Sequence, residues 1–415
     1  REGAVRKDKA TMENDARWIY NDVAKGFEKA RETKKPLLVV LRCVPCLACM
    51  GMDAAVLSDK SIEALLDEFV CVRLINANAI DLGQFQFDYD LSFSTMVFNG
   101  DGTVYGRYGS WAHQKDPYDS TLTGYRRALE AALAVHKGYP ANKEALSGKQ
   151  GAPMPFRTPV EIPMLAAKYQ RELDWNNKIV GSCVHCHQVG DAFRTWYREQ
   201  SKPVPIEWIH PMPAPETIGL TLAADQVARV SEVAPGSAAA KAGFQKGDEI
   251  VSLKGQPLIS TTDVCWVLHR SSDTAAIPVV VKRGDAEQKL EITLPEGWRS
   301  TTDSSKRAGF WPMRGMATGG MVLEDLPDEE RTKRGMDHKQ LALFVKSVGQ
   351  YGKHAAAKNA GFQKDDLIVE IDGITTRMTE SGLVEKFLTE RMVGTKVKAV
   401  VMRGAKRVEL ELPMQ

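Results

Sequence analysis

The residues best suited to chemistry lie in one short segment near the middle of the chain. Within it Cys183, Cys186 and His187 are arranged as C-x-x-C-H. Two thiols at this spacing lie about one helical turn apart and can bond the two vinyl groups of one porphyrin. The imidazole that follows directly is then positioned to ligate the iron. The segment therefore predicts one covalently attached haem c, with His187 as an iron ligand.

A zinc half-site is the alternative for the same segment, because zinc also binds cysteine and histidine. A structural zinc site needs a second ligand pair at similar spacing, and the other clustered cysteines lie far upstream. Haem is therefore favoured. The stretch Trp208–Pro213 would bring His210 or Met212 back over the haem as the second axial ligand. Five-coordinate iron and a ligand from another domain remain open alternatives.

A second reactive stretch begins at Cys43 and reads C-x-x-C-x-x-C. It follows a continuous apolar run, Pro36–Arg42, that is typical of a buried strand, and precedes a helix-like stretch. A helix N-terminus favours thiolate, so Cys43 is the expected nucleophile and Cys46 the resolving thiol. Cys49 adds a third thiol to this predicted catalytic cluster.

Two other interpretations of the three-cysteine stretch stay open. Cys46, Cys49 and Met52 are soft sulfur ligands that favour copper(I), and Cys43 would complete such a set. Alternatively, two of the cysteines form a structural disulfide and the third is inert. A copper site and a dithiol would both make this end of the chain a centre of redox or metal chemistry.

The order of elements over residues 1–140 resembles the thioredoxin fold, with a charged arm predicted for residues 1–15. The resemblance rests on a strand that delivers C-x-x-C to a helix and on a later hairpin around Asn99-Gly-Asp-Gly102. It implies thiol–disulfide oxidoreductase activity. Arg42 stands where thioredoxins carry tryptophan, and Ser94 stands where they carry the cis-proline beside the disulfide.

Residues 141–215 are predicted to form a linker and a helical segment that resembles a compact c-type cytochrome. This segment is shorter than a usual cytochrome c domain. From residue 216 the sequence repeats, since Ala234–Ile250 is echoed by His354–Ile368. The repeated pattern resembles PDZ domains of bacterial Deg-type proteases, over 216–300 and 301–415. No protease nucleophile motif accompanies them.

PDZ domains bind peptide C-termini by adding a strand to a sheet edge, so the resemblance implies a protein or peptide partner. The carboxylate-binding loop would contain Gly219 and Leu220 in the first copy, and Gly320 and Met321 in the second. In the second copy, the neighbouring segments 306–316 and 327–340 are candidates to cover the groove in which the peptide would bind. A PDZ pair used only to dock neighbouring domains is the alternative.

Composition narrows the remaining choices. A net charge of +2 and only 7% aromatic residues give no reason to expect nucleic acid as a partner. No apolar run is long enough for a transmembrane helix. The chain begins at Arg1 without methionine, which suggests a removed signal peptide. Because C-x-x-C-H haem attachment takes place outside the cytoplasm in the families that use it, we expect a periplasmic or secreted protein.

Together these features predict a multidomain α/β + α + β protein that combines a thioredoxin-like fold, a helical haem c segment and two PDZ domains. The expected function is thiol–disulfide oxidoreduction or electron transfer to a redox partner protein, with peptide recruitment by the PDZ pair. Copper binding and delivery is one alternative. A non-catalytic PDZ scaffold with an electron-transfer haem is the other.

Overall fold

The computed structural model describes residues 1–42, 59–91, 93–109 and 122–415. The predicted three-cysteine stretch and Met52 lie outside these residues. The chain divides into two compact units. Unit 1 contains residues 1–189 and 212–299, and unit 2 contains residues 190–211 and 300–415. The division falls inside the predicted haem segment, directly after Val189.

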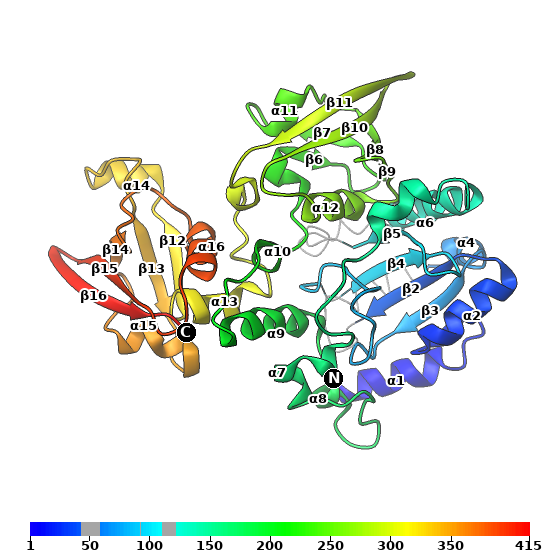
Figure 1. Ribbon diagram of the computed structural model, residues 1–415, viewed down its shortest axis with the longest axis horizontal. Coiled ribbons are helices and arrows are strands. Elements are labelled where there is room, and N and C mark those ends of the chain that lie inside the picture. The colour runs from blue at the N-terminus through cyan, green and yellow to red at the C-terminus, as the bar shows by residue number, and fades with distance from the viewer. Residues whose placement is uncertain (43–58, 92, 110–121) are drawn as a thin grey trace. The chain divides into compact units, whose positions relative to one another are not determined.

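The first sheet of unit 1 has the order β1-β3-β2-β4-β5 (Figure 1). The first three of these strands run parallel, and β4 and β5 form an antiparallel hairpin on the far side of β2. The strands are β1 (Trp18–Tyr20), β2 (Leu37–Arg42), β3 (Val70–Leu74), β4 (Phe93–Phe98) and β5 (Val104–Tyr108). The hairpin predicted around Asn99–Gly102 is confirmed.

Every residue of the central strand β2 is buried, because helices cover both faces of the sheet. Helix α2 packs close to one face, where Gly26 approaches Val72 and Leu37. Helix α6 covers the other face and shares a core with Leu38 and Val40. The helices of this region are α1 (Glu2–Met12), α2 (Val23–Thr33), η2 (Lys60–Ile62), α4 (Glu63–Leu66) and α6 (Leu122–Lys137).

The N-terminal arm expected for residues 1–15 is not an arm, because α1 occupies Glu2–Met12. The burial of Val5 against Ile75, Leu173 and Ile179 accounts for the difference. Short helices then connect the sheet to the haem segment. They are η4 (Glu144–Lys149), η5 (Pro159–Glu161), α7 (Pro163–Ala166), α8 (Ile179–Ser182) and α9 (Cys186–Glu199).

The rest of unit 1 is a β-rich module with the helix α12 against its core. Its strands form a two-stranded sheet, β6-β7, and a four-stranded sheet, β11-β10-β8-β9. The elements are η6 (Pro215–Ile218), β6 (Leu220–Leu222), β7 (Val230–Val233), α11 (Ala238–Ala242), β8 (Glu249–Leu253), β9 (Gln256–Pro257), α12 (Thr261–His269), β10 (Ala275–Arg283), β11 (Ala286–Leu294) and η7 (Trp298–Thr301).

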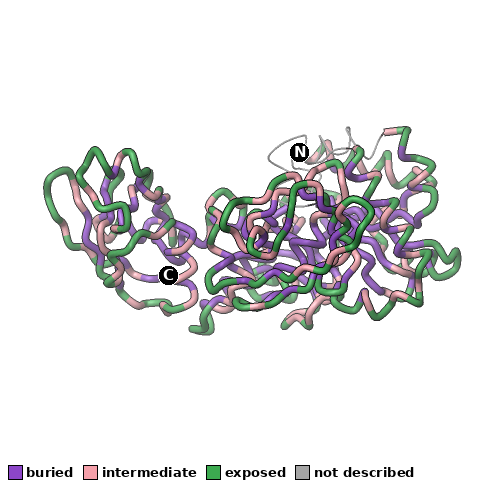
Figure 2. The backbone as a smooth tube through the Cα atoms, turned by 90° about the horizontal axis from the view of Figure 1, so that it is seen from above, coloured by how far each residue is buried: buried purple, intermediate pink, exposed green. Residues whose placement is uncertain are grey.

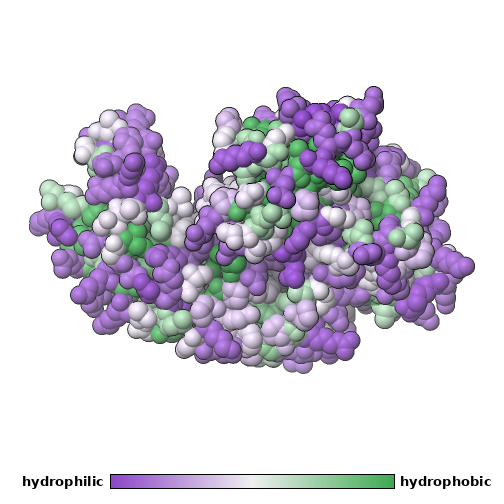
Figure 3. Space-filling model, turned by 45° about the horizontal axis from the view of Figure 1, so that its top comes forward, coloured by the Kyte–Doolittle hydropathy of each residue, from purple (hydrophilic) through white to green (hydrophobic). Residues whose placement is uncertain are grey.

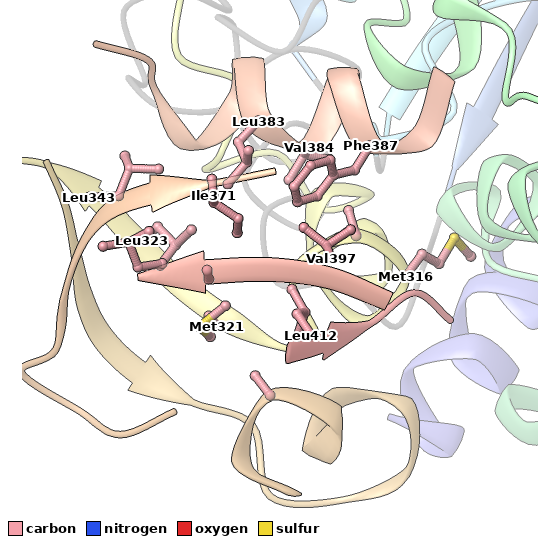
Figure 4. Close-up of a cluster of buried hydrophobic side chains, with 14 of the residues drawn as sticks. Met316, Met321, Leu323, Leu343, Ile371, Leu383, Val384, Phe387, Val397 and Leu412 are labelled. Atoms are coloured by element: carbon pink, nitrogen blue, oxygen red, sulfur yellow. The ribbon is translucent and has the colours of Figure 1, made fainter. Parts of the chain in front are cut away.

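Unit 2 repeats this order of elements around a five-stranded sheet, β12-β13-β14-β15-β16. Figure 4 shows the side chains of α16 directed at the strands, with Phe387 and Leu383 facing the sheet. The elements are α10 (Ile206–Ile209), α13 (Phe310–Ala317), β12 (Met321–Asp325), α14 (Asp328–Lys333), β13 (Leu343–Val348), η8 (Gly352–Ala355), α15 (Ala356–Asn359), β14 (Leu367–Ile371), α16 (Glu380–Glu390), β15 (Lys396–Arg403) and β16 (Lys406–Pro413).

One hydrogen-bond network marks the two modules as copies. In the first, Arg283 makes two bonds to Asp248, at 2.7 and 2.8 Å, and one to the Gly243 carbonyl at 2.9 Å. In the second, Arg403 makes the same three bonds to Asp366 and the Gly361 carbonyl, at 2.8 to 2.9 Å. The internal repeat seen in the sequence therefore extends to individual side-chain contacts.

The segment that follows the haem motif packs with the second module. Val204 and Ile209 belong to its apolar core, and Tyr197 and Trp208 lie against it. The Val204 N–H donates to the Leu388 carbonyl of α16 at 3.0 Å. These contacts explain why residues 190–211 group with unit 2 rather than with a separate haem domain.

Figure 2 shows buried and exposed stretches interleaved along the backbone, and burial alternates residue by residue along β10 of the first module. The face visible in Figure 3 is largely hydrophilic, with apolar residues in smaller patches. None of the helices in the described part of the chain combines the length and apolarity that a membrane span requires.

Candidate functional site

The two thiols of the haem motif lie on either side of a break between two helices. Helix α8 ends at Ser182, Cys183 has extended backbone, and Cys186 opens α9. Both thiols are half-buried, and neither is in a disulfide. The half-buried ring of His187 stacks on His185, with 6.0 Å between the ring centroids. The local structure therefore exposes two thiols and an imidazole within one bend of the chain.

Cys183 lies against the end of the first sheet. Its Sγ atom is 3.6 Å from the Ile75 carbonyl oxygen, as a donor. Ile75 directly follows β3, and β3 pairs in parallel with β2, with Leu74 opposite Leu41. The carboxyl ends of parallel strands meet at one edge of a sheet. Cys183 is thus at the edge where β2 ends with Arg42, the last described residue before the three-cysteine stretch.

One buried side chain, Asn78, holds the haem motif to this edge. Its Nδ2 group donates to the carbonyls of Gln170, at 2.6 Å, and Ser182, at 2.8 Å. Its Oδ1 accepts from the Val184 N–H at 2.7 Å. The Asn78 side chain is fully buried, and both its amide nitrogen and its oxygen make hydrogen bonds to the haem segment. Both residues that flank Cys183 are therefore tied to the same amide.

Sequence reasoning missed Asn78. The available signal was weak, since Asn76 and Asn78 are the first amides after an apolar strand. Polar residues at such a position usually belong to a turn. Here the Asn76 side chain accepts from the Asn78 N–H at 3.1 Å, which turns the second amide toward the haem motif.

Tyr89 lies close to the second thiol. It is buried, and its hydroxyl donates to the Phe85 carbonyl at 2.8 Å. Burial raises the pKa of Tyr89, and the charge of a Cys186 thiolate raises it further. The Tyr89 phenol thus stays protonated and uncharged beside Cys186.

The two predicted distal ligands have other partners. His210, in unit 2, is buried with its Nε2 atom 2.9 Å from the Glu385 Oε2 atom. Met212, in unit 1, is buried against Cys265 and Trp266. Either residue would have to leave these contacts to ligate iron. The distal ligand therefore stays a prediction.

The residues present fit a covalently bound haem. Two half-buried thiols and a half-buried imidazole come from one bend, and a buried amide fixes the backbone beside them. Among the described residues, no group of three His, Cys, Asp or Glu side chains could hold a metal ion. Because the three-cysteine stretch lies outside those residues, the zinc alternative for Cys183 and Cys186 stays untested.

The predicted peptide loop of the first module turns at Gly219, whose φ is +83°. A Cβ atom there would lie 2.2 Å from the Ser237 Cβ atom, so only glycine fits. The Gly219 carbonyl accepts from Ala234 at 2.9 Å, and Leu220 begins β6 beside Val233. The predicted loop therefore leads directly into strand β6, and its role in binding a carboxylate stays a prediction.

The helix beside that loop, α12, is packed on more than one side. All of its residues from Thr262 to Leu268 are buried. Asp263 accepts from the Lys149 Nζ atom at 2.7 Å and from the Arg107 N–H at 3.1 Å. The Arg107 guanidinium lies 3.6 Å from the centre of the Trp266 ring. Helix α12 is thus clamped between its own module and the first sheet.

The predicted loop of the second module also turns at glycine. Gly320 has φ of +84°. Its N–H donates to the Arg314 carbonyl at 2.9 Å, and the Met321 N–H donates to the Thr318 carbonyl at 3.2 Å. A ligand carboxylate would have to displace both bonds.

Comparison with known proteins assigns two parts of the chain. A thioredoxin-like family model matches residues 18–100, and a PDZ domain model matches residues 217–294. The periplasmic pH-dependent serine endoprotease DegQ of Escherichia coli is 30% identical over 143 residues, 34% of this chain and 28% of the relative. Serine endoprotease DegS of the same organism is 37% identical over 67 residues, 16% of this chain and 19% of the relative.

A solved serine endoprotease from Yersinia pestis shares 28% identity over 19% of this chain and 28% of its own, with a TM-score of 0.18. So low a score supports no statement about the fold. The chain covers less than a third of the length of each of these proteins. What the matches do establish is that the chain carries a thioredoxin-like domain and a PDZ domain of the Deg-protease type.

Proposed function

We propose that this chain is an extracytoplasmic redox protein in which a thioredoxin-like domain works beside a covalently attached haem c, and PDZ modules recruit a peptide partner. The observation that carries the proposal is the contact of Cys183 with the Ile75 carbonyl at the end of β3. It brings the haem motif to the sheet edge at which thioredoxin-like proteins carry their thiols. Asn78 fixes the motif there through the Ser182 and Val184 backbone.

Cys183 and Cys186 would hold the haem through thioether bonds, and His187 would ligate its iron. Bound there, the haem supplies one-electron transfer. Both thiols are half-buried and so partly accessible, and the neighbouring Tyr89 is buried. His185 stacks on the imidazole proposed as the iron ligand, with 6.0 Å between the ring centroids.

The thiol half of the reaction rests on the sequence. Cys43 is the proposed nucleophile and Cys46 the resolving thiol, with Cys49 adjacent. When Cys43 attacks a substrate disulfide and Cys46 resolves the mixed disulfide, the substrate takes the two electrons and two protons of the dithiol. Reduction of the resulting Cys43–Cys46 disulfide needs two electrons and two protons, whereas one haem carries one electron, so a partner protein must supply electrons in two successive one-electron transfers, with the protons taken from solvent.

The relatives support the location outside the cytoplasm. DegQ of Escherichia coli is named as periplasmic, and covalent haem attachment at C-x-x-C-H fits the same compartment. The PDZ match supports recruitment of protein or peptide partners, which is what such domains generally do.

The deciding experiment is mass spectrometry of the protein purified from the periplasm of a host that matures c-type cytochromes. We expect the tryptic peptide that contains Cys183 and Cys186 to carry one haem, and we expect a Soret band. The double variant Cys183→Ala/Cys186→Ala should lose both, while Cys265→Ala, a buried cysteine in the PDZ module, should keep them. A colourless wild type matured in that host would refute the haem.

Metal analysis of the reduced protein separates the thiol reaction from copper delivery by Cys46, Cys49 and Met52. A stoichiometric copper ion that Cys49→Ser abolishes would favour delivery. Disulfide exchange that Cys43→Ser abolishes in copper-free protein would favour the oxidoreductase. Absence of both would leave the PDZ scaffold with an electron-transfer haem.

A further inference from the structure

The second module presents one strand edge to which a peptide could add. Strand β12 lies at the end of its sheet and pairs only with β13. A peptide that binds by strand addition accepts hydrogen bonds from the backbone N–H groups of such an edge. Helix α16 packs beside β12 in the same core, and a peptide added to this edge would lie between the two elements.

A side chain of the module itself occupies that edge. The Leu323 N–H donates to the Glu380 Oε1 atom at 2.9 Å. Glu380 is the first residue of α16 and is 4% exposed. Its carboxylate therefore takes the place that a ligand carbonyl would occupy on β12.

An arginine from a third element holds this carboxylate. The Arg314 Nε atom donates to Glu380 Oε1 at 2.8 Å, and its Nη2 atom donates to Oε2 at 2.6 Å. Arg314 is on α13, which precedes the peptide loop and contributes Phe310 and Met313 to the shared core. The bidentate geometry fixes both side chains in one orientation.

The backbone of Arg314 also occupies the loop that was predicted to bind a ligand carboxylate. The Arg314 carbonyl accepts from the Gly320 N–H at 2.9 Å and from the Thr318 Oγ1 hydroxyl at 3.1 Å. The Thr318 carbonyl accepts from the Met321 N–H at 3.2 Å. The donors of Gly320, Met321 and Leu323 are thus all used within the module.

The first module lacks the equivalent acid. Helix α12 has Ser260 as its N-cap and Thr261 as its first residue, where α16 has Thr379 and Glu380. The one carboxylate in the first turn of α12, Asp263, is bonded to Arg107 of the thioredoxin-like domain and to Lys149 of the segment that follows it. The acid at the strand edge is therefore particular to the second module.

We propose that the second PDZ module is occupied by its own Glu380, held by Arg314, and takes up a C-terminal peptide only when this pair opens. The segment predicted from the sequence to bury this groove, residues 306–316, supplies Arg314. The inference refines the peptide recruitment in the proposed function, because it excludes the second module as a constitutive peptide site.

The test uses the full chain and a decapeptide that ends in valine with a free carboxylate, and the same peptide amidated as a negative probe. Hydrogen exchange at residues 321–325 reports binding to β12, and calorimetry reports affinity and stoichiometry. The variants are Glu380→Leu/Arg314→Met, which replaces the pair by apolar side chains, and Glu380→Gln, which keeps the shape of the acid. Glu390→Ala, at the exposed end of the same helix, is the matched control.

In the wild type and in Glu390→Ala we expect slow exchange at Leu323 and no change on adding peptide. The double variant should gain at least a tenfold tighter association at residues 321–325. Glu380→Gln should speed exchange of the Leu323 amide several-fold, which tests the contact even if the double variant fails to fold.

Peptide protection of residues 321–325 in the wild type would overturn the inference, as would unchanged Leu323 exchange in Glu380→Gln. A folded double variant that gains no binding would also overturn it. Peptide binding that protects only residues 220–222 in every variant would leave peptide recruitment standing and refute the inference alone. Binding by no variant at either strand would refute peptide recruitment as well.

Discussion

The Asn78 Oδ1 atom accepts a hydrogen bond from the Val184 backbone at 2.7 Å. This bond joins the end of the thioredoxin-like sheet to Val184, one of the two residues between the cysteines of the haem motif. The Asn78 Nδ2 group donates to the Ser182 carbonyl, on the other side of Cys183. An aspartate in this position keeps the acceptor but loses both donors, so its carboxylate would face two carbonyl oxygens.

We therefore predict that Asn78→Asp selectively impairs the bond to Cys183. The fraction of haem linked through Cys186 alone should rise, since the backbone beside Cys183 loses its anchor while α9 still holds Cys186. Mass spectrometry of the haem peptide measures the two linkages. Asn14→Asp, an exposed amide with one bond to the Ala10 carbonyl, serves as the control. Equal loss of both linkages would mean that Asn78 serves the fold alone.

The buried pair formed by Lys149 and Asp263 joins the segment after the thioredoxin-like domain to the PDZ module. Both side chains are at most 1% exposed. We predict that Lys149→Met alone lowers the free energy of unfolding by about 3–5 kcal/mol, because it leaves a buried carboxylate without its cation. The double variant Lys149→Met/Asp263→Leu should recover only part of that loss, because it leaves the buried Arg107 and Ile259 backbone N–H groups without their acceptor. Urea denaturation measures both values, and a single variant as stable as wild type would contradict the clamp.

The same junction depends on close backbone approach at Gly106 in β5. A Cβ atom there would lie 2.4 Å from the Ile259 Cγ1 atom and 2.6 Å from the Asp263 Oδ2 atom. We predict that Gly106→Ala costs about 1–3 kcal/mol through overpacking. Gly3→Ala, where a Cβ meets nothing within 4 Å, should cost nothing measurable. Equal melting temperatures for the two variants would show that the contact relaxes freely.

These contacts show where sequence reasoning succeeds and where it stops. Continuous apolar runs such as Pro36–Arg42 and the Asn99–Gly102 turn predicted the strands and the hairpin, because those signals are local. The repeat predicted two copies of one module down to the Asp248 and Asp366 positions, which hold matching arginines.

The domain contacts carried no such local signal. Asp263 reads as an ordinary polar residue in the first turn of a helix, yet its partner Lys149 lies over a hundred residues away in the chain. Asn78 and Glu380 are similar cases, since the role of each depends on residues distant in the sequence that pack against it in the fold. His210 and Met212 were chosen as distal ligands by residue type, and the structure gives both of them other neighbours.

The burial of Cys71 leads to a prediction about the reactivity of its thiol at alkaline pH. It lies in β3, is 1% exposed, and its Sγ atom is 3.5 Å from the Leu66 carbonyl oxygen. Burial raises the pKa of this thiol from its ordinary 9.0 to about 12. Since the thiolate is the reactive form, iodoacetamide at pH 8.5 should leave Cys71 unmodified in the folded protein.

The same shift fixes the sign of a stability change. Below pH 9.0 the thiol is protonated in both folded and unfolded chains, so its contribution to stability is complete. Between pH 9.0 and about 12 the unfolded chain releases the proton and the folded chain retains it, so the free energy of unfolding falls as pH rises. The fall is about 1.4 kcal/mol per pH unit at most. Cys71→Ala should remove this component from the urea-denaturation profile, and a profile identical to wild type across that range would show that Cys71 ionises without cost in the fold.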